Sequence, residues 1–430
     1  MLSPYLEVPA HETMATAASA PPPDAARSQA EEAATADVVV FGSAVVDLVF
    51  RPDSGLPAPG MTVLSRTYET HPGGKGANQA LAAHRAGAQT SFYAAVGRDA
   101  FADLALSNLT AEGVDVSGVR RDAHAQTACA CVCVSPTTGE NMIVVGNGAN
   151  ETARATQIHG GCTTCKMLVM QSEVPLEENE RAAMHARSLA QEVQTLWNAA
   201  PAPTPQTPVA TLTSLLLLSD HLVVNEHEAV ALYNLVLRNR VHDAPPPESW
   251  ANDVLERAGD DAAPENGAPP RLAIAKLYSQ LAVNGQAEFA AFSLARRFGC
   301  IVCVTLGSGG ASVYTPAVRN RTEGFHRDCY EAARPAPAPK RMHADPPNVG
   351  RNAIVDTVGA GDAFVGAYAA ALSLGTRGSD ALRIAVCAGT RACLARGAQA
   401  SPTREDLLPH LDKVRVIVDT KLAEACAETL

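Results

Sequence analysis

The sequence predicts an α/β fold, in which a doubly wound and mostly parallel β-sheet is flanked by helices. Short apolar runs rich in β-branched residues recur along the chain, and helix-compatible segments separate them. This alternation is typical of parallel sheets whose strands are joined by crossover helices. The chain has 430 residues, of which 47% are hydrophobic, so it can bury a large core.

Composition and charge exclude two classes of function. Aromatic residues make up 4% of the chain, and the formal net charge is −11. A nucleic-acid-binding protein is not expected, because such a chain neither attracts a polyanion nor offers a platform for stacking bases. A membrane protein is not expected either. The longest apolar stretch, Leu212–Val224, contains polar residues and is shorter than the ~20 residues that span a bilayer.

Residues 1–36 differ in composition from the rest of the chain. They are rich in Ala, Pro, Ser and Glu and show no hydrophobic period, which predicts a disordered N-terminal extension before a folded domain at 37–430. This segment lacks the pattern of a secretory signal, so a cytoplasmic location is expected, with an organelle or the nucleus left open. The 11 cysteines are then expected to be free thiols that pack as apolar residues, including the CxxC pairs Cys162–Cys165 and Cys300–Cys303.

The N-terminal part of the domain predicts two strands and a helix. The run VVVFGSAVVDLVF at 38–50 barely alternates, which indicates one strand buried on both faces. A short strand is expected at 62–68. A glycine cluster then opens a helix at 75–86, with Gly87 as its C-terminal cap. A strand at 91–97 and a helix at 100–112 follow.

The remaining chain predicts a hairpin and further strands. ACACVCV and ENMIVVGN, on either side of a Pro- and Gly-containing turn, indicate a β-hairpin between 128 and 145. Period-two spacing would place Cys129, Cys131 and Cys133 on one of its faces. Other apolar runs predict strands at 166–171, 221–225 and 300–307, and Pro- or Ala-rich segments predict surface insertions near 201–208, 238–270 and 316–348.

The first segment that carries chemistry is HPGGKGANQALAAHRAGA, residues 71–88. Its glycines allow a ligand to approach the backbone closely, and the N–H groups at the start of a helix favour polar or anionic ligand atoms. Lys75 and Asn78 add several hydrogen-bond donors, which suits a polyhydroxylated ligand. It is not a phosphate-binding Walker A loop, because neither Ser nor Thr follows the Gly-Lys pair. A glycine turn that merely caps an Ala-rich helix is the alternative.

The second segment is AIVDTVGAGDAFVGAYAAALSLG, residues 353–375. We expect a strand that ends at Asp356, a small-residue turn at Gly359–Gly361, and a helix that begins at Asp362 and ends at Gly375. N–H groups of such a turn converge on one point and form an anion hole. An ionised carboxylate beside an anion hole suits phosphoryl transfer to a hydroxyl, with Asp362 as general base. An N-capping Asp after a glycine turn is the alternative, but it leaves Asp356 unexplained.

Together the two segments resemble the signatures of the ribokinase family of carbohydrate kinases, also called the PfkB family. GGKGAN at Gly73–Asn78 is similar to the N-terminal signature, and DTVGAGDAF at Asp356–Phe364 is similar to the C-terminal one. The resemblance extends from Asp37 to about Leu411. It implies a three-layer sandwich with a small β-sheet lid, formed by strands near 44–70 and 125–147. GGKGANQA and ARGAQAS are most similar to the members that phosphorylate ribose.

The resemblance also implies roles for individual residues. The implied sugar-binding residues are Asp47, Gly74, Lys75, Gly76, Ala77, Asn78, Glu173 and Asp362. The implied nucleotide-binding residues are Asn225, Thr305, Leu306, Gly307, Ser308, Gly309, Gly310 and Gly361, and the anion hole is Gly359, Ala360 and Gly361. The implied potassium ligands are Asp356, Val358, Ala392, Ala395, Gly397 and Ser401, and Glu228 is implied to bind magnesium through water. Val45, Gly309 and Val386 depart from the family pattern, at a sugar contact, a nucleotide contact and an adenine contact respectively.

The implied activity is ATP-dependent phosphorylation of D-ribose at O5, with Mg²⁺ and K⁺ as cofactors and a homodimer formed through the lid. Another sugar or nucleoside kinase of the same family, acting on adenosine or fructose, is the first alternative. A catalytically silent relative is a second, although Asp362, Asn225 and Glu228 are all present. A dinucleotide-binding oxidoreductase is excluded, because no GxGxxG follows the first strand.

Overall fold

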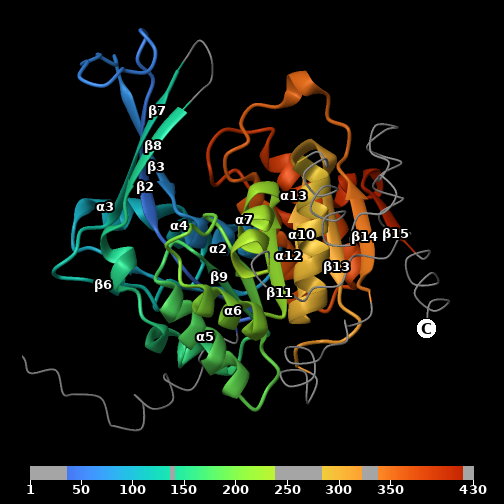
Figure 1. Ribbon diagram of the computed structural model, residues 1–430. Helices are drawn as coiled ribbons and strands as arrows, with labels where there is room; N and C mark the ends of the chain where they lie inside the picture. Colours follow the sequence, from blue (N-terminus) through green and yellow to red (C-terminus); the bar gives the residue numbers. More distant parts are fainter. Residues whose placement is uncertain (1–35, 136–140, 238–282, 322–337, 420–430) are drawn as a thin grey trace, which may run out of the picture. The chain divides into compact units, whose positions relative to one another are not determined.

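The computed structural model describes residues 36–135, 141–237, 283–321 and 338–419. Nine strands of these segments form one sheet, in the order β15-β14-β13-β12-β11-β10-β9-β1-β4 (Figure 1). Their bounds are β1 Val38–Phe41, β4 Thr90–Tyr93, β9 Met167–Gln171, β10 Gln194–Asn198, β11 His221–Asn225, β12 Ile301–Thr305, β13 Ala311–Thr315, β14 Lys340–Asp345 and β15 Arg415–Asp419. The pairs from β4 to β12 are parallel, and the pairs from β12 to β15 are antiparallel. The predicted α/β class is therefore confirmed.

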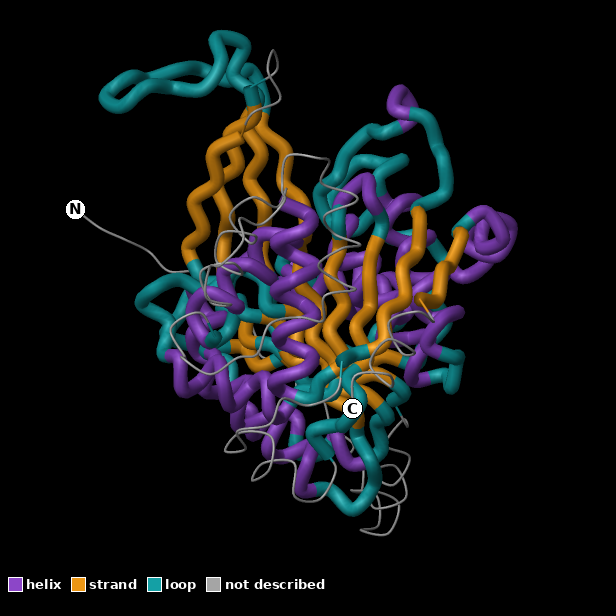
Figure 2. Tube along the Cα trace, turned by 45° about the vertical axis from the view of Figure 1, so that its right-hand side comes forward, coloured by secondary structure: helices purple, strands orange, loops and turns teal. Residues whose placement is uncertain are grey.

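Helices cover both faces of this sheet (Figure 2). One face packs against α5 (Leu176–Ser188), α6 (Val209–Leu218), α7 (Glu226–Val236) and α10 (Val283–Phe298). The other packs against α2 (Lys75–Arg85), α3 (Ala100–Ala105), α4 (Ser107–Glu112), α12 (Ala360–Ser373), α13 (Gly378–Ala392) and α14 (Arg404–Leu407). Because the central strands are buried on both faces, runs such as Val38–Phe41 are apolar at every position.

A second sheet has four strands in the order β3-β2-β7-β8. They are β2 Val45–Phe50, β3 Tyr68–Gly73, β7 Ala128–Val134 and β8 Asn141–Gly146. β2 pairs with β7 in parallel, and the other two pairs are antiparallel. In Figures 1 and 2 this sheet extends away from the carboxyl ends of the parallel strands. The predicted hairpin is confirmed, and residues 136–140 of its turn lie outside the described residues.

The prediction of one strand at 38–50 is wrong, because the chain leaves the large sheet at Gly42 and enters the small one at Val45. The apolar run therefore serves two sheets. The short strand expected at 62–68 is wrong as well. Pairing with β2 begins only at Tyr68, and the preceding Met61 and Leu64 are exposed.

Other boundaries also differ from the predictions. The expected helix at 100–112 is split into α3 and α4, and short strands β5 (Ala95–Val96) and β6 (Arg120–Arg121) flank it. No strand precedes Asp356: in the described chain, residues 354–358 are loop, with Ile354 and Val355 exposed. Residues 201–208 are a loop, as expected, whereas the insertion near 238–270 lies outside the described residues.

The segment 316–348, expected to be an insertion, contains strand β14. Its sequence KRMHAD hides the strand because charged residues take up positions that usually carry apolar ones. Arg341 is nevertheless buried, and its Nε donates to Glu288 Oε1 of α10 at 3.1 Å. On its other face, Ala344 and Met342 pack against the core, so an ion pair and apolar packing both contribute to holding this strand. Across the described helices, none is both long and apolar enough to cross a membrane.

Candidate active site

The start of α2 lies against the loop that joins β1 to β2. Gly74 is the N-cap residue, with a φ of 90°. Ala77 N–H donates to the Ser43 carbonyl at 2.9 Å, and Gly76 N–H donates to Ser43 Oγ at 3.2 Å. The first glycine-rich segment is therefore held at the carboxyl end of β1, where open α/β sheets bind their ligands.

Glu173 joins this loop to the helix. Its Oε2 accepts hydrogen bonds from Ser43 Oγ at 2.6 Å and from the Lys75 backbone N–H at 2.9 Å. Burial lowers the pKa of the Lys75 ammonium, but nearby carboxylates, chiefly Asp362 and Glu173, outweigh this effect and leave its pKa raised. Lys75 is therefore a fixed positive charge in the site.

Asp47 lies on β2, across from the start of α2. Burial, and then the negative charge of Glu173, raise its pKa to about 6, although His71 acts in the opposite direction. The carboxylate is thus ionised at neutral pH but poorly solvated. A ligand whose hydroxyl groups donate to this carboxylate would replace the missing water.

The second motif starts helix α12 earlier than predicted. The helix begins at Ala360 and not at Asp362, and Gly359 is its N-cap with a φ of 78°. Two features require glycine at position 359. Its φ is left-handed, and a Cβ would lie 2.1 Å from the Ala398 carbonyl oxygen. The first turn of a helix leaves its N–H groups without partners in the helix, so this turn can receive an anion.

Asp362 lies in that first turn and is 8% exposed. Its Oδ2 accepts from Asn78 Nδ2 at 2.9 Å, and its Oδ1 accepts from Gln79 Nε2 at 2.9 Å. Among the described side chains, Asn78 Oδ1 is buried and has no hydrogen-bond partner. It can accept from a ligand hydroxyl.

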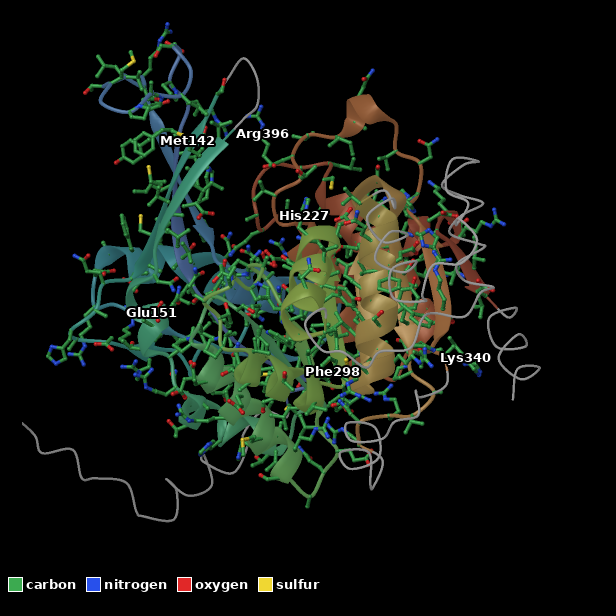
Figure 3. The ribbon with its side chains drawn as sticks, viewed as in Figure 1. Met142, Glu151, His227, Phe298, Lys340 and Arg396 are labelled. Atoms are coloured by element: carbon green, nitrogen blue, oxygen red, sulfur yellow. The ribbon has the colours of Figure 1, made fainter. Side chains whose placement is uncertain are left out.

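A cavity of about 810 Å³ connects these groups. Both motifs, β2 and β3 line it, together with the hairpin and the loop after α13. Six of the predicted sugar-binding residues line the cavity: Asp47, Gly74, Lys75, Asn78, Glu173 and Asp362. Gly76 and Ala77 are buried beneath it. In Figure 3, Arg396 lies between the small sheet and the C-terminal loops, and it also lines the cavity.

One wall of the cavity is apolar. The residues of the small sheet that line it include Val45, Ala130, Val132, Val134, Ile143 and Val145. Alternation along β7 places Cys129, Cys131 and Cys133 on the opposite face, as expected. The cavity therefore combines a polar floor with an apolar cover, as is typical of small-molecule sites.

Of the predicted nucleotide residues, Gly361 lies in the first turn of α12. The others lie at the carboxyl ends of β11 and β12, and none of the set lines this cavity. Asn225 pairs in register with Thr305, and residues 307–309 form a single turn after it. Asn225 and Glu228 make a reciprocal capping box at the start of α7, with bonds of 2.8 and 2.9 Å. Val386, which departs from the family pattern at the implied adenine contact, is 5% exposed and packs in the core.

Glu228 is buried, so it is not a solvated residue on the surface of α7. Burial raises its pKa, while the Asn225 N–H and Lys75 lower it and Asp362 raises it further. Glu228 is therefore close enough to Lys75 and Asp362 for their charges to act on it.

The two loops predicted to bind a cation are joined by Asp356. Its Oδ1 accepts from Val358 N–H and its Oδ2 accepts from Gly397 N–H, both at 3.0 Å. Ser401 contacts helix α2 instead. Its Oγ and its carbonyl oxygen accept hydrogen bonds from the Arg85 guanidinium at 3.2 and 2.9 Å respectively. In the described chain, no cluster of three or more His, Cys, Asp or Glu side chains is arranged to hold a metal ion.

Sequence reasoning missed several residues that build the site. Ser43 follows β1 and bonds Glu173 and Gly76, and Gln79 bonds Asp362. Arg396 and Ala398 line the cavity from the loop after α13. The only available signal for Gln79 was its place directly after Asn78 in the first motif.

Comparisons with known proteins agree on one family. A family model for pfkB family carbohydrate kinases matches residues 35–246 and 286–405. The ribokinase of Schizosaccharomyces pombe is 37% identical over 207 residues, which are 46% of this chain and 62% of that protein. The chain spans less than two thirds of the length of curated relatives such as this one and the ribokinase of Bacillus subtilis.

Solved structures share the fold. The ribokinase of Thermotoga maritima has a TM-score of 0.63 at 24% identity, over 88% of this chain and 99% of that chain. The structure of Arabidopsis thaliana ribokinase complexed with ribose and ATP has a TM-score of 0.61, also at 24% identity, over 88% of this chain and 99% of that chain.

Proposed function

Because the chain belongs to the pfkB family of carbohydrate kinases, we propose that it phosphorylates D-ribose at O5 with ATP. The observation that carries the proposal is Asp362, which lies in the first turn of α12 and lines a cavity with Asp47, Lys75, Asn78 and Glu173. One carboxylate beside a helix N-terminus and a ring of polar groups suit an acceptor with several hydroxyls. The names of relatives such as the S. pombe protein support ribose as this acceptor.

In this proposal, Asp47, Glu173 and Asn78 bind sugar hydroxyls and hold O5 near Asp362. Asp362 accepts the proton of that hydroxyl as the phosphoryl group is transferred. The N–H groups at Gly359–Gly361 stabilise the charge on the phosphoryl oxygens, and Lys75 adds a positive charge close by. ATP would lie toward the carboxyl ends of β11 and β12, along Asn225 and residues 305–310.

Magnesium would neutralise charge on the ATP phosphates. Glu228 fits a role through water. In the capping box its Oε2 accepts from the Asn225 N–H, and its Oε1 is the remaining acceptor.

Potassium would hold the Gly359–Gly361 turn in a fixed geometry. Asp356 fits as a ligand, since each of its oxygens accepts one N–H and keeps a lone pair, and carbonyls of Val358, Ala392, Ala395 and Gly397 would complete the set. Ser401 fits less well, because Arg85 already places a positive charge on its hydroxyl.

A different acceptor is the second candidate. Val45 gives the cavity an apolar residue where a polar sugar contact was expected, which favours testing adenosine and fructose beside ribose. A coupled assay of ADP release over these three acceptors decides between them. Ribose should give the highest kcat/KM, and preference for either of the others would replace the proposed substrate.

Asp362→Asn tests the proposed base. The amide keeps the shape but cannot accept the proton, so kcat should fall by about 10²-fold or more while ATP and sugar still bind. The measurement is initial rate together with calorimetric binding of both substrates. Asp380→Asn is the matched control, because Asp380 lies in the first turn of the neighbouring helix α13 and outside the cavity. An Asp362→Asn enzyme as active as this control would overturn the assignment.

We also propose that the protein forms a homodimer through the small sheet. The face of this sheet that points away from the cavity carries the apolar side chains of Phe50, Tyr68, Met142 and Val144, whereas Leu48 on the same face packs against the core. Val144 and Tyr68 are 72% and 61% exposed. A second copy of the chain could cover these side chains.

A further inference from the structure

Behind Asp362 lies a buried network of amide side chains. Gln79 is fully buried in α2, and its Nε2 donates to Asp362 Oδ1 and to Asn198 Oδ1, both at 2.9 Å. Its Oε1 accepts from Gln171 Nε2 at 2.8 Å. Gln171 ends β9 and Asn198 ends β10, so the network ties the catalytic motif to two neighbouring strands of the large sheet.

A single backbone carbonyl, at one end of this network, determines the orientation of all three amide side chains. Asn198 Nδ2 donates to the Val223 carbonyl oxygen at 3.0 Å, and that oxygen can only accept. Asn198 must therefore turn its Oδ1 toward Gln79, which in turn must present its Nε2. A flipped Gln79 would place its own oxygen against two acceptors, Asn198 Oδ1 and Asp362 Oδ1, and its Nε2 against that of Gln171.

Gln79 is separated from the cavity. Asn78 and Asp362 line the cavity, whereas Gln79 is fully buried and lies outside that lining. Gln79 therefore has no direct route to a ligand, and its effect on chemistry can pass only through the side chains that it touches.

We propose that Gln79 is a positioning residue for Asp362, and that Gln171 and Asn198 hold it in place. This inference rests on the proposed function, in which Asp362 is the general base. A carboxylate held at only one oxygen can rotate about its Cβ–Cγ bond. With Asn78 on Oδ2 and Gln79 on Oδ1, both oxygens are fixed, and so is the plane of the carboxylate. Small misplacements of reacting groups can lower rates by about 10²-fold, so such fixation acts on the chemical step.

Gln79→Met tests the proposal. Methionine is similar in size and apolar but cannot donate to Asp362. The expected result is a kcat about tenfold or more below wild type, with the KM values for sugar and ATP changed by less than about threefold. Gln79→Glu is the second variant. It keeps the shape, and either its negative charge faces Asp362 or, when protonated, it can donate to only one of its two acceptors. It should show the same split between kcat and KM.

Asn320→Leu is the matched control. Asn320 is a buried amide that donates to the carbonyls of Leu217 and Ser219, away from the cavity. Its removal should lower the melting temperature while leaving kcat within about twofold of wild type. A similar kcat for Gln79→Met and Asn320→Leu would overturn the proposal.

A double-mutant cycle separates positioning from general damage. If Gln79 acts through Asp362, Gln79→Met should lower kcat by less than about twofold in the Asp362→Asn background. A tenfold loss in both backgrounds would overturn the proposal, because the effect would then not depend on the carboxylate. An active Asp362→Asn enzyme would instead contradict the proposed base. An inactive Asp362→Asn beside a fully active Gln79→Met would contradict this inference alone.

Discussion

At the scale of single residues, the carboxylate of Asp47 disfavours folding. Asp47 is ionised at neutral pH although burial and Glu173 raise its pKa to about 6. In the unfolded chain its pKa is near 3.8. An acid whose pKa is raised by folding destabilises the fold once it is ionised, so stability should increase as pH falls through 6. Function, and not stability, accounts for a carboxylate at this position.

Asp47→Asn should therefore stabilise the protein and weaken sugar binding. At about 1.4 kcal/mol per pKa unit, the gain near neutral pH is on the order of 2–3 kcal/mol, and it should shrink toward pH 4 as wild-type Asp47 takes up its proton. The KM for sugar should rise by about tenfold or more, because bonds to a charged acceptor are lost. Thermal melting at neutral and acidic pH, with initial rates, measures both effects.

Asp53→Asn is the control for this change. Asp53 is exposed and pairs with Arg66 on the surface at 2.8 Å. Its replacement should alter stability by less than about 0.5 kcal/mol at either pH. If Asp47→Asn also alters stability by less than about 0.5 kcal/mol at neutral pH, the inference that buried Asp47 destabilises the fold is contradicted.

At the scale of elements, the site depends on how closely α2 packs against α12. Gly366 of α12 makes this possible, since a Cβ there would lie 2.5 Å from Ala82 Cβ and 2.6 Å from the Gln79 carbonyl oxygen. The two helices carry Asn78, Gln79 and Asp362, so their separation sets the bonds within the site.

Gly366→Ala should destabilise the protein by about 1–3 kcal/mol, because the methyl group overpacks the helix pair. Gly378→Ala in α13 is the matched control. Its nearest neighbour would be Met342 Cε at 3.8 Å, so the same substitution should be neutral or stabilise by about 0.5–1 kcal/mol. Denaturant unfolding measures both, and equal free energies of unfolding for the two variants would contradict the packing argument.

At the scale of the whole molecule, the small sheet has two different faces. One covers the cavity and the other is apolar and exposed, with Val144 and Met142 on its edge strand β8. Val144→Lys should convert the proposed dimer into a monomer, because a charge would be buried without a partner. Sedimentation velocity checks this, with Met184→Lys on the exposed side of α5 as the control. A monomeric wild-type protein, or a dimeric Val144→Lys variant, would contradict the proposed interface.

Much of the fold and part of the site could be predicted from local sequence. The runs at 166–171, 221–225 and 300–307 predict strands that form as β9, β11 and β12, and they are apolar at consecutive positions because both faces of these strands are buried. The two glycine-rich motifs carry a strong local signal, because helix starts that receive a ligand need small residues and exposed N–H groups. The cavity contains Lys75, Asn78 and Asp362, as those motifs predict.

Other features could not be read locally. The buried charge of Arg341 in strand β14 is paired with Glu288, 53 residues away along the chain. The break between β1 and β2 depends on which strands are available for pairing on each side of Gly42. In both cases the decisive partner is distant along the chain.

The sequence by itself determined the fold class, the positions of the two motifs and the identity of the candidate base. Only the tertiary structure decided that Gln79 bonds Asp362, 283 residues away, and that Asn198 and Gln171 orient it. Hydrophobic periodicity records that a side chain is buried, but not what it is buried against. Hydrogen-bond partners of buried polar groups are chosen by the packing of whole elements, here α2 against α12 and the ends of β9 and β10.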